Sequence, residues 1–251
     1  MLFNYHTHTY RCNHASGTER EYIEAAIKSG IKTLGFSDHA PYEFDGGYVS
    51  SFRMGMDKAE DYFTTVRALK EEYSDKIRIL CGLELEYYPL YHKAEMEKLK
   101  KYSPDYLILG QHLLGNEPER RMLTDQTEDE CFTEYMDQLI AAMQTGEYLY
   151  VAHPDMIGCR FTETVMRKGF TRFCEAAKEL NVPVELNLLG IRGKRQYPDP
   201  FFFEIVGKVG CKVILGKDAH AAEDFLHPTD EKDALEMVKA LNLDLITEPI
   251  I

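Results

Sequence analysis

Short apolar runs alternate with segments of helical spacing along the whole chain. Runs such as KTLGFSDH and YLILGQH are typical of buried strands, because they are short, mainly apolar and followed by polar residues. Strands are predicted at residues 2–6, 32–39, 77–87, 106–112, 148–155, 182–190 and 212–220. Helices are predicted at residues 18–29, 56–73, 92–102, 128–144, 165–180, 200–210 and 231–241, and a short apolar tail ends the chain.

The first helix has clear boundary signals. Thr18 and Glu21 form a capping box, in which each side chain bonds to the backbone of the other residue. Gly30 suits the position just after the last turn, where the backbone often adopts a left-handed conformation.

Seven units of strand followed by helix predict an α/β fold. Nearly continuous apolar strands are typical of a parallel sheet covered by helices. At 251 residues, a single domain over 1–251 is expected, folded as a distorted (β/α)7 TIM-like barrel. An open doubly wound sheet is the alternative. No glycine-rich phosphate loop follows the first strand, which disfavours nucleotide binding by that device.

Composition narrows the partners. The net charge of −13 disfavours binding to a nucleic acid polymer, and no apolar run reaches the roughly 18 residues of a membrane span. The six cysteines are scattered without a Cys-x-x-Cys pair, which favours free thiols and a cytoplasmic protein. The sequence leaves the oligomeric state open, and a homo-oligomer is one of the open alternatives. An acidic protein that binds an anion needs a local source of positive charge.

Histidines gather at the predicted carboxyl ends of the strands. In a parallel barrel these ends meet on one face, where active sites are built. His-x-His and Asp-x-His on a strand point both side chains to the same side. The strand ends carry His6, His8, His39, Glu84, His112, His153, Asp218 and His220, and the first loop carries His14. The two other histidines are expected to be an exposed helix start, His92, and a loop residue, His227.

Any one of these residues could be an ordinary hydrogen-bonded strand end. Histidine at the same end of five strands instead favours a metal site, because neutral imidazole is the commonest metal ligand and carboxylate suits the same cations.

Seven short motifs lie at the predicted strand ends and in the first loop. They are His6-Thr7-His8-Thr9, Cys12-Asn13-His14-Ala15, Ser37-Asp38-His39-Ala40, Gly82-Leu83-Glu84, Gly110-Gln111-His112, Ala152-His153-Pro154-Asp155 and Gly216-Lys217-Asp218-Ala219-His220. Together they resemble the PHP (polymerase and histidinol phosphatase) superfamily, in particular its histidinol-phosphate phosphatase branch. The resemblance implies a (β/α)7 barrel and three divalent transition-metal ions, such as Zn, Mn or Fe. The implied metal ligands are His6, His8, His14, His39, Glu84, His112, His153, Asp218 and His220.

The resemblance also implies how the ligands are shared. His6, His8, Glu84 and Asp218 would hold one metal, and Glu84 would bridge to a second on His112 and His153. The third would lie on His14, His39 and His220. Glu84, Asp218 and His220 are the expected catalytic residues, with Glu86 as the alternative bridging carboxylate.

Three divalent cations with two carboxylates and seven neutral imidazoles leave a strongly cationic site, which suits a phosphate monoester. The expected reaction is hydrolysis of a small phosphorylated substrate by a metal-bridging hydroxide. By resemblance, L-histidinol phosphate would give L-histidinol and phosphate in histidine biosynthesis. The candidate phosphate-binding residues are Arg53, Arg160, Arg192 and Arg195. The rivals are a nucleotide phosphoesterase, a metal-dependent amidohydrolase and a non-catalytic metal-binding protein.

Overall fold

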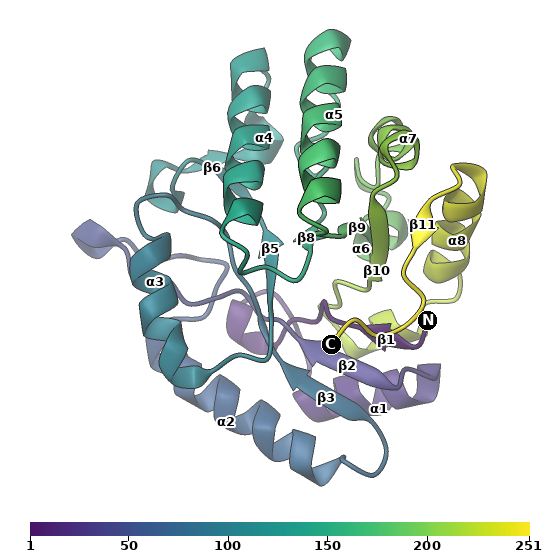
Figure 1. Cartoon of the computed structure of the whole chain (residues 1–251). Helices are drawn as coiled ribbons and strands as arrows, with labels where there is room; N and C mark the ends of the chain where they lie inside the picture. Colours follow the sequence, from purple (N-terminus) through teal and green to yellow (C-terminus); the bar gives the residue numbers. More distant parts are fainter.

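The computed structural model describes residues 1–251, and its strands form a ring with the long helices outside it (Figure 1). The strands of the ring are β1 (Phe3–Asn4), β2 (Thr33–Phe36), β3 (Arg78–Cys81), β4 (Leu83–Glu84), β5 (Leu107–Gly110), β8 (Val151–Ala152), β9 (Val184–Asn187) and β10 (Lys212–Gly216). The helices are α1 (Glu19–Ser29), α2 (Met56–Glu72), α3 (His92–Leu99), α4 (Asp129–Gln144), α5 (Glu163–Glu179), α6 (Leu188–Arg192), α7 (Pro200–Val209) and α8 (Asp230–Ala240).

Two parallel sheets make up this ring. One has the order β1-β2-β3, and the other has the order β11-β10-β9-β8-β5-β4, where β11 is Asp244–Leu245. Gly82 separates β3 from β4, and an isolated bridge between His39 and Glu84 carries the pairing from one sheet to the other. A second bridge, Thr7 to Ala219, joins the segments that follow β1 and β10. These bridges complete a distorted seven-unit barrel, as the sequence predicts.

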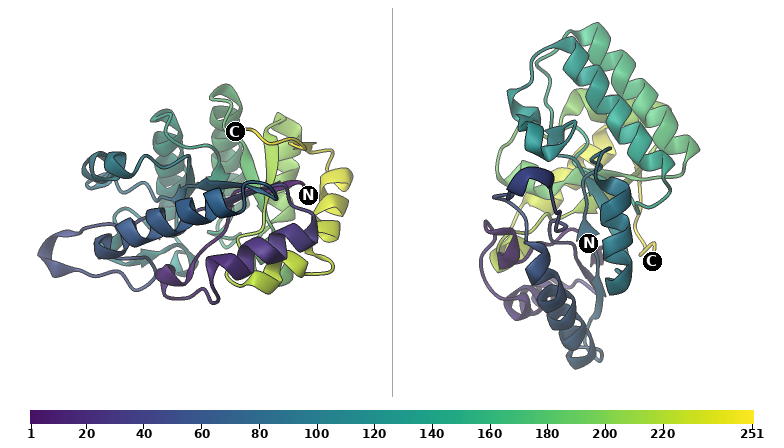
Figure 2. Two further views of the ribbon diagram at one scale, coloured as in Figure 1. Left: turned by 90° about the horizontal axis from the view of Figure 1, so that it is seen from below. Right: turned by 90° about the vertical axis from the view of Figure 1, so that its left-hand side faces the viewer.

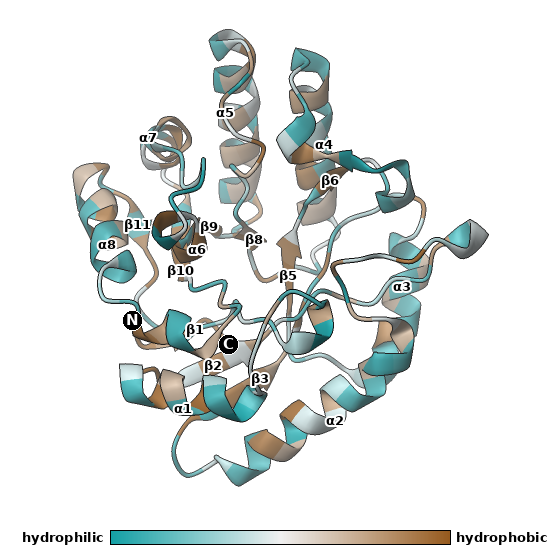
Figure 3. Cartoon of the chain, turned by 180° about the vertical axis from the view of Figure 1, so that it is seen from behind, coloured by the Kyte–Doolittle hydropathy of each residue, from teal (hydrophilic) through white to brown (hydrophobic).

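Two apolar clusters hold the barrel together. The larger fills the space between the strands and the surrounding helices, whose apolar sides face the ring (Figure 3). The smaller includes Tyr5, Tyr106 and Tyr150 and lines the inside of the ring. The hydroxyl of Tyr106 lies 2.7 Å from the carbonyl oxygen of Tyr5, and a Cβ at Gly82 would lie 2.5 Å from its ring. Glycine at this strand junction therefore leaves the room that the tyrosine ring occupies.

The predicted helices begin and end within a few residues of the observed ones, whereas the predicted strands run past the observed ones, for example 212–220 against Lys212–Gly216. α1 has the predicted capping box of Thr18 and Glu21, and Gly30 follows it with φ of 92°. The apolar tail contributes β11, which pairs in parallel with the first residues of β10. An antiparallel pair, β6 (Leu113–Leu114) with β7 (Arg121–Met122), lies between β5 and α4.

Other details differ from the sequence-based expectations. His92 is buried rather than exposed, because its Nε2 lies 2.5 Å from Glu147 and its ring packs beside Tyr87. α6 follows β9 without a break, where the sequence suggested only a strand end.

All six cysteines are free thiols, as the sequence predicts. No helix has both the length and the apolar character that crossing a membrane requires. The chain ends lie near each other on one side of the ring (Figure 2).

Candidate metal centre

A cavity of about 520 Å³ lies at the carboxyl ends of the strands. Eight of the nine predicted metal ligands line it, and the ninth, His6, lies fully buried beside them. The predicted ligands that line the cavity are His8, His14, His39, Glu84, His112, His153, Asp218 and His220. The structure thus brings together side chains from six strand ends and the first loop.

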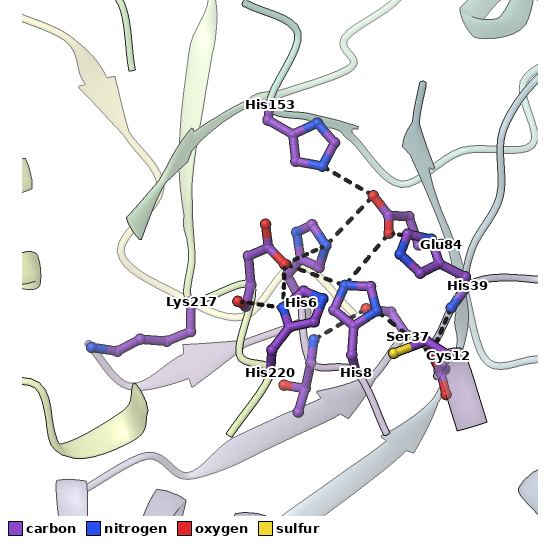
Figure 4. Close-up of polar contacts among 12 residues, drawn as sticks. His6, His8, Cys12, Ser37, His39, Glu84, His153, Lys217 and His220 are labelled. Atoms are coloured by element: carbon purple, nitrogen blue, oxygen red, sulfur yellow. Dashed lines mark hydrogen bonds and ion pairs between the residues drawn. The ribbon is translucent and has the colours of Figure 1, made fainter. Parts of the chain in front are cut away.

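Glu84 lies at the centre of this cluster (Figure 4). Its Oε1 is 3.1 Å from His153 Nε2, and its Oε2 is 3.0 Å from His39 Nδ1. The ring nitrogens of His6, His8 and His112 lie 3.6, 3.5 and 3.9 Å from its oxygens. Gly110 on the neighbouring strand makes this position available, because a Cβ there would lie 2.6 Å from Cγ of Glu84. One carboxylate therefore faces five imidazoles.

Asp218 forms the second acidic point of the cluster. Its Oδ1 lies 3.2 Å from His8 Nε2, 3.3 Å from His220 Nδ1 and 3.5 Å from His6 Nε2. Asp218 has φ of 47°, and His153 has φ of 31°. A positive φ is uncommon for residues with a Cβ and is concentrated at functional sites. The strained backbone at these two positions is consistent with side chains held for a ligand.

His14 reaches the cluster from a short turn. The 3₁₀-helix Tyr10–Cys12 ends at Asn13 with φ of 70°, and this left-handed residue reverses the chain. The Nε2 atom of His14 then lies 3.0 Å from Nε2 of His220. The turn explains how a residue outside any strand joins ligands from β1 and β10.

Several of the imidazoles have a fixed orientation because an acceptor holds the ring nitrogen that faces away from the centre. His6 Nδ1 is 2.8 Å from Glu185 Oε1, and His112 Nδ1 is 2.9 Å from Glu86 Oε1. Carboxylates behind histidine ligands are common in metal sites, where they fix the tautomer and the ring direction. Glu86 thus faces His112 from behind and does not lie between the ligand groups as a bridging carboxylate.

Glu185 was not among the sequence-predicted site residues. Its signal is an acidic residue within the apolar run VPVELN, where burial demands a partner. Gly216 on the neighbouring strand leaves room for it, since a Cβ at that position would lie 2.5 Å from Cδ of Glu185.

Several buried polar atoms of the cluster make no well-oriented hydrogen bond, although some of them lie close to another polar atom. They are His6 Nε2, His8 Nδ1, His39 Nδ1, Glu84 Oε2, His153 Nδ1 and Asp218 Oδ1. Buried polar atoms are rarely left unpaired, so this concentration points to a ligand that pairs with them. Sets of three donor atoms lie within 4.8 Å of one another, including His6-His153-Asp218, His6-His8-Glu84 and His8-His39-His220. Two ligand atoms about 2.1 Å from one cation lie at most about 4.2 Å apart. The separations of 3.2 and 3.5 Å between Asp218 Oδ1 and the Nε2 atoms of His8 and His6 are within that limit, so the residues fit bound metal ions.

Charge interactions within the cluster are strong. Burial alone would raise the pKa of the Glu84 carboxyl, but His39, His6 and His112 hold that pKa well below its ordinary value. Burial, together with the neighbouring His8, lowers the pKa of His220 to about 2. Burial opposes a charge on His6 as well, but Asp218, Glu185 and Glu84 raise its pKa to about 10. The carboxylates around His6 therefore favour a positive charge at that position.

The four candidate arginines are placed very differently. Arg195 lines the cavity and donates from Nη1 to the hydroxyl of Tyr197 at 2.8 Å. Arg53 is buried behind the cavity wall, bound to Glu86 and Glu117 at 2.8 and 2.6 Å.

Arg160 and Arg192 also point elsewhere. The exposed Arg160 donates to the carbonyl oxygen of Thr124, and Arg192 donates to the carbonyl oxygens of Lys217 and Asp218. None of Arg53, Arg160 and Arg192 lines the cavity, so their positions do not support the expectation that one of them grips phosphate. The donors of Arg53 and Arg192 are also used within the protein.

A parallel barrel with imidazoles and carboxylates at its strand ends defines the class of metal-dependent barrel hydrolases. Within that class, the chain belongs to the PHP domain family, whose model matches residues 4–189. It is 33% identical to the histidinol-phosphatase of Bacillus subtilis, with 87% of this chain and 93% of that protein covered. It is 26% identical to a probable histidinol-phosphatase of Deinococcus radiodurans, with 87% and 86% covered.

The fold is also found in solved structures. Histidinol phosphate phosphatase from Lactococcus lactis, solved in complex with zinc, L-histidinol and phosphate, superposes with a TM-score of 0.74 at 20% identity, over 98% of this chain and 95% of that one. A putative histidinol phosphatase from Listeria monocytogenes gives the same TM-score at 19% identity, over 88% and 96%.

Proposed function

We propose that this protein hydrolyses L-histidinol phosphate to L-histidinol and phosphate, as a histidinol-phosphatase of histidine biosynthesis. The observation that carries the proposal is the cavity itself, whose lining combines eight of the nine candidate metal ligands with one arginine, Arg195. Membership of the PHP family and the names of the related proteins support the choice of substrate.

The metal content we propose is three divalent transition-metal ions on the nine ligands His6, His8, His14, His39, Glu84, His112, His153, Asp218 and His220. Zinc is the ion in the related Lactococcus lactis enzyme, and manganese or iron suits the same donors. Such ions, when bound, lower the pKa of a coordinated water and neutralise phosphate charge. In this proposal Glu84 would be shared between ions, and Asp218 and His220 would be further ligands.

Arg195 is the residue we assign to the phosphate group. Nη1 of Arg195 donates to the Tyr197 hydroxyl at 2.8 Å, and the other donors of the guanidinium are available to a ligand. Phosphate oxygens match this planar fork, which can donate two hydrogen bonds in parallel. The apolar part of the lining, formed by Phe52, Met122, Met156 and Leu189, is available to the carbon skeleton of the leaving alcohol.

A substrate panel with purified protein tests the proposal. Phosphate release would be measured from L-histidinol phosphate and from AMP, with zinc or manganese supplied and again after chelation. We expect L-histidinol phosphate to be the better substrate and chelation to abolish turnover. Preference for AMP would instead support a nucleotide phosphoesterase. No turnover of any monoester by fully metal-loaded protein would refute phosphatase activity.

A further inference from the structure

The Arg192 side chain is only 6% exposed, and its guanidinium is fully engaged within the protein. Nη1 donates to the carbonyl oxygen of Lys217 at 2.6 Å, and Nη2 donates to that of Asp218 at 2.7 Å. Nε lies 3.0 Å from Oδ1 of Asp224. The planar fork therefore spans two successive peptide groups directly after β10.

The two carbonyl groups flank the strained residue of the site. Asp218 has φ of 47°, a conformation that costs free energy for a residue with a Cβ and persists only where its surroundings enforce it. Arg192 binds the peptide oxygen on each side of that φ, and Lys217 N donates to Asn4 Oδ1 at 2.7 Å. These bonds hold the backbone that points the Asp218 carboxylate at His8.

The same arginine reaches a second ligand through Asp224. The other oxygen of Asp224, Oδ2, accepts from the backbone N–H of His220 at 2.8 Å and of Ala221 at 3.0 Å. The ion pair between Arg192 and Asp224 thus supports both candidate ligands that follow β10, Asp218 and His220. The carboxylate of Asp230 lies below, with Oδ1 2.9 Å from Lys217 Nζ and Oδ2 3.7 Å from Arg192 Nη1.

The short helix α6 explains how Arg192 arrives there. Asn187 caps α6 by accepting from the N–H of Gly190 at 3.0 Å, and its Nδ2 donates to Asp218 Oδ2 at 3.0 Å. Both ends of α6 therefore contact Asp218, one through its carboxylate and the other through its backbone. Lysine could not replace Arg192 fully, because a single ammonium lacks the fork that reaches two carbonyls.

We propose that Arg192 and Asp224 form a brace that positions Asp218 and His220 and thereby sets the affinity of the site for metal. Arg192 is a positioning residue in this assignment and does not contact substrate. The inference rests on the metal centre of the proposed function and is independent of which phosphate ester is cleaved.

The test compares Arg192→Met, Arg192→Lys and Asp224→Asn with the wild-type protein. Metal per chain would be measured by elemental analysis after equilibration with chelator-buffered zinc, and folding of the metal-free proteins by circular dichroism. We expect Arg192→Met to bind its most weakly held ion roughly 10- to 100-fold less tightly, the scale for losing a group that supports a ligand. Arg192→Lys and Asp224→Asn should show smaller losses in the same direction.

Two controls separate this role from others. Arg20→Met removes an exposed arginine that pairs with Glu72, and should leave metal affinity unchanged. Arg195→Ala should keep its metal but lose turnover, whereas Arg192→Met should regain turnover as zinc is raised to saturation.

Wild-type metal affinity in Arg192→Met would overturn the brace. If that variant does not fold, wild-type affinity in Asp224→Asn would overturn it equally. If the wild-type protein does not cleave L-histidinol phosphate but Arg192→Met still binds metal more weakly than the wild type, the proposed substrate is refuted and the brace is supported.

Discussion

Replacing Arg195 by alanine should disable phosphate binding while leaving the metal centre intact. Arg195 is the only arginine or lysine that lines the cavity, so no second cation of that kind stands ready to replace it. The substitution removes the guanidinium and leaves the Tyr197 hydroxyl, which is its present partner at 2.8 Å.

The magnitude follows from the number of bonds lost. A guanidinium fork can make two hydrogen bonds to phosphate oxygens, each contributing about 1.5–2 kcal/mol when the partner is charged. Together they contribute roughly 3–4 kcal/mol, and each 1.4 kcal/mol corresponds to a factor of ten in rate. We therefore expect kcat/KM for L-histidinol phosphate to fall roughly 10²- to 10³-fold in Arg195→Ala.

The assay is steady-state phosphate release at saturating zinc, with competitive inhibition by inorganic phosphate as a second readout. Arg195→Ala should weaken inhibition by phosphate and retain wild-type metal content. Arg195→Lys should recover part of the loss, since a point charge supplies attraction without the fork. Arg160→Ala is the matched control, because Arg160 is exposed and donates to Thr124 outside the cavity. Near wild-type turnover in Arg195→Ala, together with a large loss of turnover in Arg160→Ala, would refute the assignment of Arg195 to phosphate.

Three further expectations follow from the same geometry. The purified protein should carry up to three transition-metal ions per chain by elemental analysis, and full activity with a single bound ion would contradict a trinuclear centre. Glu84→Gln should lower both metal occupancy and turnover, because the carboxylate faces five imidazoles; normal values of both would show that Glu84 is not shared between ions. Gly35→Ala should lower the free energy of unfolding in urea by about 1–3 kcal/mol, because its Cβ would lie 2.8 Å from Tyr106 Cζ; an unchanged midpoint would show that the tyrosine moves aside.

The fold and the metal-ligand candidates could be predicted from the sequence because both depend on position along strands. Parallel strands end on one face of a barrel, so any residue at a strand end is placed by the topology alone. This is why His112 and Asp218, far apart in sequence, both line the cavity. Glu84 is placed by the same rule, with Gly110 leaving space for it on the neighbouring strand.

The arginines could not be placed in this way. Their long side chains leave loops, and the direction of a loop residue depends on partners that no local pattern specifies. Arg192 and Arg195 are three residues apart, yet Arg192 binds the backbone carbonyls directly after β10 and Arg195 lines the cavity. Burial of His92 depended likewise on a distant partner, Glu147.

Charge placement explains how a protein of net charge −13 can attract a phosphate ester. Three divalent ions would bring six positive charges to the cavity, and Glu84 and Asp218 would balance two of them. The carboxylate of Glu86, which supports His112, is already paired with Arg53 at 2.8 Å, so it subtracts little from the cavity.

Glu185 is different, because its contacts are to His6 and to neutral groups such as the hydroxyl of Tyr150. Asp38 is placed in the same way, since its Oδ1 lies 3.5 Å from His8 Nδ1 and its other contacts are to neutral groups. Glu185 and Asp38 would remove two further charges and leave the centre cationic by about two, before any charge on a bound water is counted. Arg195 adds a third positive charge to the lining of the same cavity. The negative surface charge is screened over about 8 Å at physiological salt, whereas these charges act at contact distance. A dianionic monoester that enters the cavity therefore meets a field set by the site rather than by the net charge.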